Sequence, residues 1–234
     1  MLRIRATRQL RDFMLDVDIA VADGETLVLM GSNGSGKTTV LNLISGLMRP
    51  DEGTIETAGM TLFSEEAGID VPPEARNIGY VFQNYALFPH MTVFDNVAFG
   101  LRMRRTTPRE IRRQVEEELG PVGLWELRNV KASRLSGGQK QKVALARCLI
   151  TEPALLLLDE PLNALDAETH DLLRESIHQR LKRERITSII VLHSASDTLT
   201  LGGRVCVMDR GKVVLSGLPA EILEHGRTGD NLFN

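Results

Sequence analysis

The chain has 234 residues, of which 42% are hydrophobic and 25% are charged, and its formal net charge is −3. This composition is typical of a globular protein with a sizeable core, so it excludes a disordered chain, and the balanced charge gives no indication of a nucleic-acid partner. The apolar runs, such as Ala154–Leu158, are far shorter than the roughly 20 residues that a membrane-spanning helix needs, and the N-terminal residues lack the apolar stretch of a secretory signal.

Short apolar or β-branched runs alternate along the chain with helical patterns, which is typical of an α/β protein. The first two runs alternate apolar and polar residues, which favours antiparallel strands at an edge of the sheet. Several later runs are apolar throughout, which indicates strands that are covered on both faces. We expect strands over Arg3–Thr7, Leu15–Val21, Thr26–Met30, Gly53–Thr57, Gly79–Phe82, Leu155–Leu158, Ser188–Leu192, Arg204–Asp209 and Lys212–Ser216.

Helix signals separate many of these strands. A helix over Lys37–Leu47 directly follows a glycine-rich loop. Thr107 as a cap and Pro108 at the first position start a second helix, which ends near Leu119. Two more helices are expected, one from Gly138 to just before Pro153 and one from a cap at Asp166 to about Arg183.

The glycine-rich loop matches the phosphate-binding pattern G-x-x-x-x-G-K-[ST] at every fixed position. Glycines let backbone N–H groups face an anion, and the N-terminus of the following helix adds the positive end of its dipole. The lysine is expected to reach the β- and γ-phosphates of a nucleotide, and the threonine to offer its hydroxyl to Mg²⁺. The predicted ATP contacts are Gly31, Ser32, Asn33, Gly34, Ser35, Gly36, Lys37, Thr38 and Thr39.

The apolar strand Leu155–Leu158 is followed by two carboxylates, Asp159 and Glu160. Doubly wound sheets bind their ligands at the carboxyl ends of such strands. Asp159 is therefore expected to support Mg²⁺, and Glu160 to polarise an attacking water. The alternative is a strand end that caps a helix or faces solvent, and the phosphate loop upstream disfavours it.

The segment Leu135–Gln139 reads LSGGQ and is followed by the helical pattern KQKVALARCL. A serine hydroxyl, two glycines and a free helix N-terminus form a second phosphate site in the same chain. With this signature between the phosphate loop and the acidic pair, the chain resembles the ATP-binding subunit of ABC transporters over almost its whole length. In that family the second site serves the partner subunit. The resemblance therefore implies a head-to-tail homodimer in which ATP also contacts Ser136, Gly137, Gly138, Gln139 and Asp166.

Three further residues match the family one by one. Gln83 resembles the glutamine that senses Mg²⁺ and water, Asp166 lies in the loop that crosses to the partner, and His193 resembles the histidine that contacts the γ-phosphate. The implied cofactors are ATP and Mg²⁺. The implied catalytic residues are Glu160, His193 and Gln83, and the implied metal site consists of Thr38, Gln83 and Asp159.

The resemblance also implies the organisation of the fold. We expect an α/β protein with a P-loop NTPase core, in which helices flank a mostly parallel sheet, and an antiparallel β subdomain. Residues 88–131 contain no convincing strand, so we expect an α-helical subdomain inserted there. A single ABC ATPase domain should cover residues 1–225, and residues 226–234 should form a short, unanchored tail.

Some positions depart from the family pattern. Leu10 stands where many relatives place an aromatic residue that stacks on adenine, and Phe13 is the nearby aromatic that could replace it. Asn163 stands where serine is common, and Ser194 rather than an aspartate follows His193. None of these changes removes a phosphate or metal contact.

The resemblance implies an ATPase that powers an ABC transporter at the cytoplasmic face of the cell membrane. Separate permease subunits would dock on the stretch Gln83–Val93; alternatively Tyr85, Leu87 and Phe88 only pack the core of the helical subdomain. The sequence looks closest to importers of oxyanions such as molybdate, tungstate or sulfate, which also use a solute-binding protein. The alternatives are an exporter subunit, a non-transport ABC ATPase, and a scaffold that binds ATP without turnover.

Overall fold

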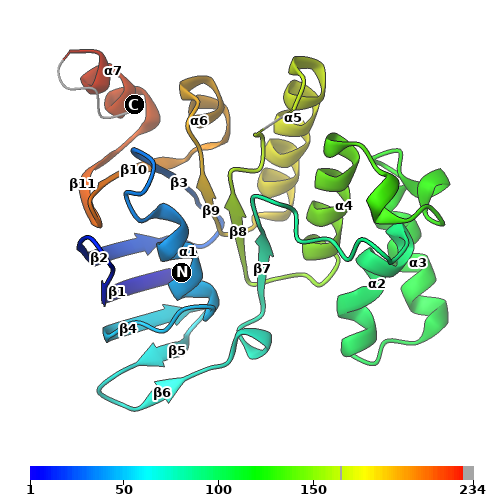
Figure 1. The fold of residues 1–234 in the computed structure, drawn as a ribbon, viewed down its shortest axis with the longest axis horizontal. Helices are drawn as coiled ribbons and strands as arrows, with labels where there is room; N and C mark the ends of the chain where they lie inside the picture. The colour runs from blue at the N-terminus through cyan, green and yellow to red at the C-terminus, as the bar shows by residue number, and fades with distance from the viewer. Residues whose placement is uncertain (164, 229–234) are drawn as a thin grey trace.

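The structure, a computed structural model, describes residues 1–163 and 165–228 and builds them around an eleven-stranded mixed sheet (Figure 1). The strand order is β6-β5-β4-β1-β2-β11-β10-β3-β9-β8-β7. The strands are β1 (Leu2–Gln9), β2 (Met14–Val21), β3 (Thr26–Met30), β4 (Glu52–Thr57), β5 (Met60–Ser64), β6 (Ile69–Asp70), β7 (Ile78–Val81), β8 (Leu155–Asp159), β9 (Ser188–Val191), β10 (Arg204–Asp209) and β11 (Lys212–Gly217).

Helices flank the sheet and form one end of the molecule (Figure 1). The α-helices are α1 (Lys37–Ser45), α2 (Val93–Met103), α3 (Pro108–Leu119), α4 (Gly137–Leu149), α5 (Ala167–Glu184), α6 (Ala195–Leu201) and α7 (Pro219–Thr228). Short 3₁₀ helices cover Pro73–Ala75, Trp125–Leu127 and Ala132–Arg134. Among the helices in the described ranges, none is both long and apolar enough to cross a lipid bilayer.

The strands β10, β3, β9, β8 and β7 run parallel, so their carboxyl ends lie at the same edge of the sheet. Strands β3, β8 and β9 are almost wholly buried because helices cover both faces. Alternate residues of these strands pack against α1 on one face and against α4, α5 and α6 on the other. This arrangement confirms the predicted P-loop NTPase α/β fold.

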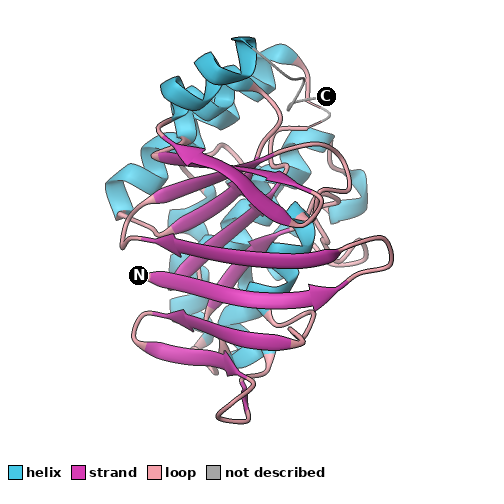
Figure 2. Cartoon of the chain, turned by 90° about the vertical axis from the view of Figure 1, so that its left-hand side faces the viewer, coloured by secondary structure: helices cyan, strands magenta, loops and turns pink. Residues whose placement is uncertain are grey.

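The other half of the sheet is antiparallel, and Figure 2 shows its long strands crossing the face nearest the viewer. Apart from the exposed Met14, the apolar residues of β1 and β2 point to the core and their charged residues to solvent, as the alternating sequence pattern predicts. The prediction that these two strands lie at an edge is wrong. Strand β4 pairs with β1, strands β5 and β6 extend beyond it, and β11 joins β2 on the other side.

The regular elements of segment 88–131, which the structure describes throughout, are helices, and its only β pairing is an isolated bridge between Thr92 and Lys131. Helices α2 and α3 begin at threonine caps, with the hydroxyls of Thr92 and Thr107 accepting from backbone N–H groups. Their buried residues form a separate apolar cluster with part of α4. Figure 1 places these helices at the end of the molecule that lies away from β1 and β2.

The C-terminal part of the chain contains two helices that the sequence patterns do not indicate, α6 and α7. Helix α7 runs to Thr228 and therefore continues into the segment expected to be an unanchored tail. Residues 229–234 of that segment lie outside the described residues.

Candidate functional site

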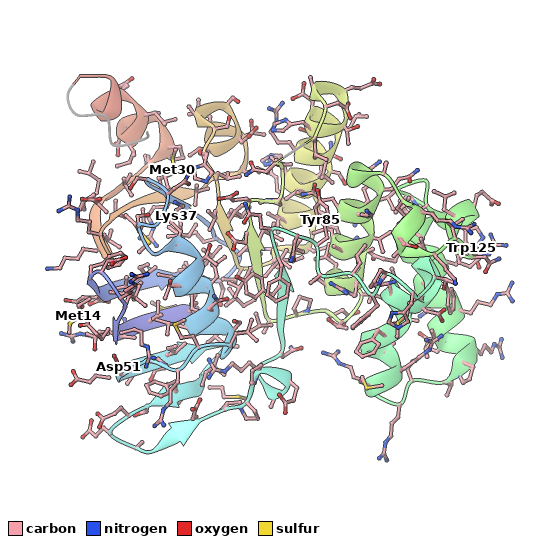
Figure 3. All side chains as sticks on the ribbon, in the orientation of Figure 1. Met14, Met30, Lys37, Asp51, Tyr85 and Trp125 are labelled. Atoms are coloured by element: carbon pink, nitrogen blue, oxygen red, sulfur yellow. The ribbon has the colours of Figure 1, made fainter. Side chains whose placement is uncertain are left out.

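The residues predicted to bind phosphate and Mg²⁺ and to catalyse hydrolysis form a first group. They meet at the carboxyl ends of the parallel strands. The phosphate loop follows β3, Asp159 ends β8, and His193 follows β9. Gln83 comes shortly after β7. In Figure 3 the labelled Met30, which ends β3, and Lys37, which begins α1, lie close together at this edge.

The loop between β3 and α1 has the backbone of an anion cradle. Gly31 has a φ of +135°, and a Cβ there would lie 2.1 Å from the Met208 carbonyl oxygen, so only glycine fits. Gly36 is the N-cap of α1, where no side chain caps the first turn, so N–H groups stay available for an anion. The buried Ser35 hydroxyl finds no hydrogen-bond partner among the described residues, and a phosphate oxygen would fill that gap.

Lys37 folds back over this loop. Its side chain is only 5% exposed, and Nζ donates to the carbonyl oxygens of Gly31 and Ser32, both at 2.8 Å. Burial lowers the pKa of the Lys37 ammonium, and the nearby charges of Glu160 and Asp159 oppose this shift. The loop therefore holds a buried positive charge beside two carboxylates, where a polyphosphate would balance it.

A cleft of about 300 Å³ extends from this loop to the connection between β1 and β2. Phe13 does not project freely into it, because its ring packs against Gly211, where a Cβ would lie 2.6 Å from Phe13 Cδ2. The sequence reasoning missed the two charged residues of this wall, Arg11 and Asp12. The cleft is lined by Leu10, Arg11, Asp12, Phe13, Asn33, Gly34, Gly36, Lys37, Thr38, Thr39 and Glu160.

Asp159 and Thr38 form the part of the site that fits a divalent cation. Asp159 is buried, and its Oδ1 accepts from Thr38 Oγ1 at 3.3 Å. Burial raises the pKa of the Asp159 carboxyl, while the Thr38 hydrogen bond lowers it. A hydroxyl and a carboxylate next to a phosphate cradle are ligands that Mg²⁺ accepts together with phosphate oxygens and water. The described residues contain no cluster of three or more His, Cys, Asp or Glu side chains able to hold a metal alone.

Glu160 contacts the other two predicted catalytic residues, Gln83 and His193. Its Oε2 accepts from Gln83 Nε2 at 2.7 Å, and its Oε1 lies 2.7 Å from His193 Nε2. Asn163 Nδ2 donates to the same carboxylate, a contact that the sequence reasoning missed. Glu160 also has a φ of +52°, a left-handed conformation that is uncommon outside glycine and clusters at functional sites.

The signature residues lie in a second group, away from the cleft. Ser136 caps α4 in a reciprocal capping box with Gln139, in which Gln139 N donates to Ser136 Oγ at 3.3 Å and Ser136 N to Gln139 Oε1 at 3.0 Å. Asp166 caps α5 with a single side-chain hydrogen bond, its Oδ1 accepting from Thr169 N at 3.0 Å. A Cβ on Gly138 would lie 2.5 Å from Thr169 Cγ2, so the two helix starts are neighbours.

This second group faces solvent. Ser136, Gly137 and Asp166 are exposed, and none of the signature residues lines the cleft beside Lys37. The hydrogen bond from the Thr169 backbone lowers the pKa of Asp166, so this carboxylate is charged at neutral pH. One copy of the chain therefore carries two separated sets of predicted ATP contacts.

Comparison with curated proteins gives many relatives. The trehalose/maltose import ATP-binding protein MalK of Thermococcus litoralis is 42% identical over 209 residues, which is 89% of this chain and 56% of that protein. The molybdate/tungstate import ATP-binding protein WtpC of Pyrococcus abyssi is 42% identical over 227 residues, which is 96% of this chain and 64% of that protein. The chain thus spans just over half to nearly two-thirds of the length of these relatives.

Solved structures show the same fold. CbiO1 of Clostridium perfringens, part of the ABC transporter complex cbiONQ, has a TM-score of 0.82 and 30% identity, covering 95% of this chain and 90% of that one. The dimeric ATP-binding cassette MJ0796, bound to ADP and phosphate, has a TM-score of 0.80 and 27% identity, covering 94% of this chain and 99% of that one. The sequence profile described as "ABC transporter" matches residues 14–163. The chain therefore belongs to the ABC transporter family.

Proposed function

We propose that the chain binds MgATP in the cleft beside Lys37 and hydrolyses its γ-phosphate. The observation that carries the proposal is the meeting of Gln83, His193 and Asn163 on Glu160, at the end of the phosphate loop. Glu160 is thereby held where it can orient a water in line with the scissile bond. Positioning and electrostatics supply most of the catalysis in phosphoryl transfer.

Each residue has a separate role in this proposal. The loop N–H groups, the Ser35 hydroxyl and Lys37 bind the phosphates, and Lys37 exchanges its loop carbonyls for phosphate oxygens. Thr38, Asp159 and Gln83 would hold Mg²⁺, which neutralises charge on the phosphates when bound. His193 donates toward the γ-phosphate, and Glu160 accepts from the attacking water.

We further propose a head-to-tail homodimer. Ser136, Gly137 and Asp166 are exposed in one copy, and Gly138 and Gln139 beside them are partly buried. In a dimer they would close over the cleft of a second copy, so that each ATP is bound between two chains. The N-terminus of α4 would supply first-turn N–H groups that the capping box leaves available to the γ-phosphate, whose charge holds the halves together until hydrolysis removes it.

The ATPase is proposed to drive a membrane permease from the cytoplasmic face. The relatives named above are import ATP-binding proteins, and the alignment with the molybdate/tungstate protein covers 96% of the chain. We therefore propose import of an oxyanion delivered by a solute-binding protein. Tyr85, Leu87 and Phe88 are each only partly buried, so they both pack inward and leave apolar surface for the permease.

Isothermal titration calorimetry with MgATP tests the phosphate site. Lys37→Ala should abolish binding, because it removes the buried charge that faces the phosphates. Lys212→Ala is the matched control, since Lys212 is exposed on β11 and does not line the cleft. Unchanged ATP affinity in Lys37→Ala would refute this site.

Co-purification from mildly solubilised native membranes tests the transport role. A permease and a solute-binding protein should accompany the tagged chain, and titration of that binding protein with molybdate, sulfate, maltose and spermidine identifies the cargo. Recovery of soluble partners alone, with no chain in the membrane fraction, would instead support a non-transport ATPase.

A further inference from the structure

A buried carboxylate outside the cleft joins α5 to α6. Asp197 lies in the first turn of α6 and is only 3% exposed. Its Oδ2 lies 3.1 Å from His170 Nε2, and its Oδ1 accepts from Arg174 Nη1 at 3.2 Å. Both donors belong to α5. Because a buried carboxylate is costly unless it is paired, these contacts fix where α6 meets α5.

The Asp197 side chain does more than cap its own helix. An acidic residue at the third helical position commonly accepts from the N-cap N–H of the same helix. In α6 the backbone half of that arrangement is present, since Asp197 N donates to Ser194 Oγ at 3.3 Å. The carboxylate oxygens are instead directed to α5, which makes the side chain an interhelical link.

The two ends of this link lie beside two parts of the proposed site. On α6, Ser194 caps the helix and directly follows His193, whose Nε2 lies 2.7 Å from Glu160 Oε1. On α5, the backbone N–H of His170 donates to the carbonyl oxygen of Asp166 at 2.9 Å. Asp166 is the N-cap of α5 and the proposed contact to the second copy.

We propose that Asp197 is a positioning residue for His193, and that His170 is the residue through which the start of α5 holds it. This inference rests on the proposed function, because it assigns a role within an ATP-hydrolysing site. Fixing the first turn of α6 fixes the adjoining His193 and therefore its contact with Glu160. The same link connects Asp166 to His193, so a second copy that contacts Asp166 acts on the catalytic histidine through one helical turn.

The charged side chains around His170 support its role in holding Asp197. Asp171 Oδ1 lies 3.6 Å from His170 Nδ1 and 2.9 Å from Arg174 Nη2. His170 is thus held between two carboxylates, Asp171 on its own helix and Asp197 on α6. Arg174 bridges the same two carboxylates, so the link has two parallel donors and one acceptor on α6.

A positioning role and a purely structural role of Asp197 predict different effects of its substitution. If Asp197 only stabilises the packing of α6 on α5, its loss lowers the free energy of unfolding, but the folded molecules keep their kcat. A positioning role lowers the kcat of folded molecules and leaves ATP binding intact. Substitution of Asp197 or His170 should leave the affinity for ATP unchanged, because neither residue lines the nucleotide cleft.

Steady-state ATP hydrolysis by the full chain separates these cases. We expect Asp197→Asn and His170→Leu to lower kcat about tenfold or more, with KM for ATP within about twofold of wild type. His170→Arg restores a donor and should recover most of the loss. Asp197→Asn with His170→Leu should cost no more than Asp197→Asn alone, because His170 acts only through the Asp197 carboxylate, which Asp197→Asn already removes. His178→Leu is the control, the same change further along α5 beside Lys182.

Proton NMR of the histidine rings gives a readout that does not depend on turnover. The chain has five histidines, so the His193 Cε1 proton can be assigned by its loss in His193→Gln. This resonance should move in Asp197→Asn and stay in place in His178→Leu. Folded Asp197→Asn with wild-type kcat, or with an unmoved His193 resonance, would overturn the inference. Absence of turnover in the wild type would refute the proposed function instead, and the resonance would still test the link.

Discussion

At the Glu160 side chain, donors from three separated parts of the chain converge. Gln83, Asn163 and His193 reach one carboxylate although 77 residues separate Gln83 from Glu160 and 33 separate Glu160 from His193. The left-handed backbone at Glu160 costs on the order of 1–3 kcal/mol and persists only where its surroundings fix it. We interpret this strain as what aims the carboxylate into the cleft rather than along β8.

The wall of the cleft formed by Leu10 and Phe13 is where we propose that the base of the nucleotide lies. Leu10 is half-buried, and the ring of Phe13 is held against Gly211, so the cleft lacks a freely stacking aromatic among its lining residues. Leu10→Tyr should therefore tighten ATP binding about fivefold or more, since one base–aromatic stack contributes about 1–3 kcal/mol. Calorimetry with MgATP and MgGTP measures the change, with Met14→Tyr, outside the cleft, as the control. Equal ATP affinity in wild type and Leu10→Tyr would contradict the proposal that residue 10 lies against the base.

Part of the candidate site could be predicted from local sequence motifs, whereas Gln83 and His193 could be assigned only through the resemblance to the family. Lys37, Asp159 and Glu160 follow patterned strands, and the structure brings them to one edge as the parallel topology requires. Asn163 and the wall residue Arg11 could not be predicted in this way. Their positions depend on a turn and a loop whose shape no short motif specifies.

At the scale of elements, α4 is tied to the segment that follows Gln83. Arg147 donates to the carbonyl oxygens of Tyr85 and Ala86 at 2.9 and 2.8 Å. These two residues have φ of +65° and +45°, both left-handed. The guanidinium also lies 5.6 Å from the centre of the Phe88 ring. One arginine of α4 therefore maintains a strained turn beside Gln83, one of the predicted catalytic residues.

Arg147→Ala should destabilise the protein by about 2 kcal/mol, because it removes two charge-assisted hydrogen bonds to the carbonyl oxygens of the turn at Tyr85 and Ala86. For a chain of this size, that corresponds to a melting temperature lower by about 4–8 °C. Arg147→Lys should restore only part of the loss, since an ammonium cannot form the same two-pronged contact. Thermal unfolding measures both, with Arg112→Ala on the exposed face of α3 as the control. A melting temperature equal to wild type would disprove the role of Arg147.

The elements that the sequence did not indicate share a physical feature. Strand β5 is short, and its residues Met60–Ser64 lack a clear two-residue period, so its identity comes from pairing with β4. Helix α6 has only seven residues, including two threonines of weak helix propensity. It forms because Ser194 caps it and Thr198 and Leu201 are buried against the core. Tertiary packing, rather than local pattern, determines both elements.

At the scale of the whole molecule, the two sets of proposed ATP contacts are separated. The phosphate loop and Glu160 line the cleft, whereas Ser136 and Asp166 face solvent at neighbouring helix starts. A single copy therefore cannot enclose a nucleotide with both sets. A head-to-tail dimer would bring the two sets together, with the N-terminus of α4, where Ser136 is exposed, facing the cleft of the second copy.

The most direct test of the account is to measure molecular mass and ATP turnover together for Glu160→Gln. Light scattering in MgATP should give twice the 25.9 kDa of one chain, because the γ-phosphate persists and holds two copies together. Turnover should fall at least about a hundredfold, while ATP affinity stays near wild type. A variant that stays monomeric in MgATP and hydrolyses ATP at nearly the wild-type rate would contradict both the assignment of Glu160 and the shared site.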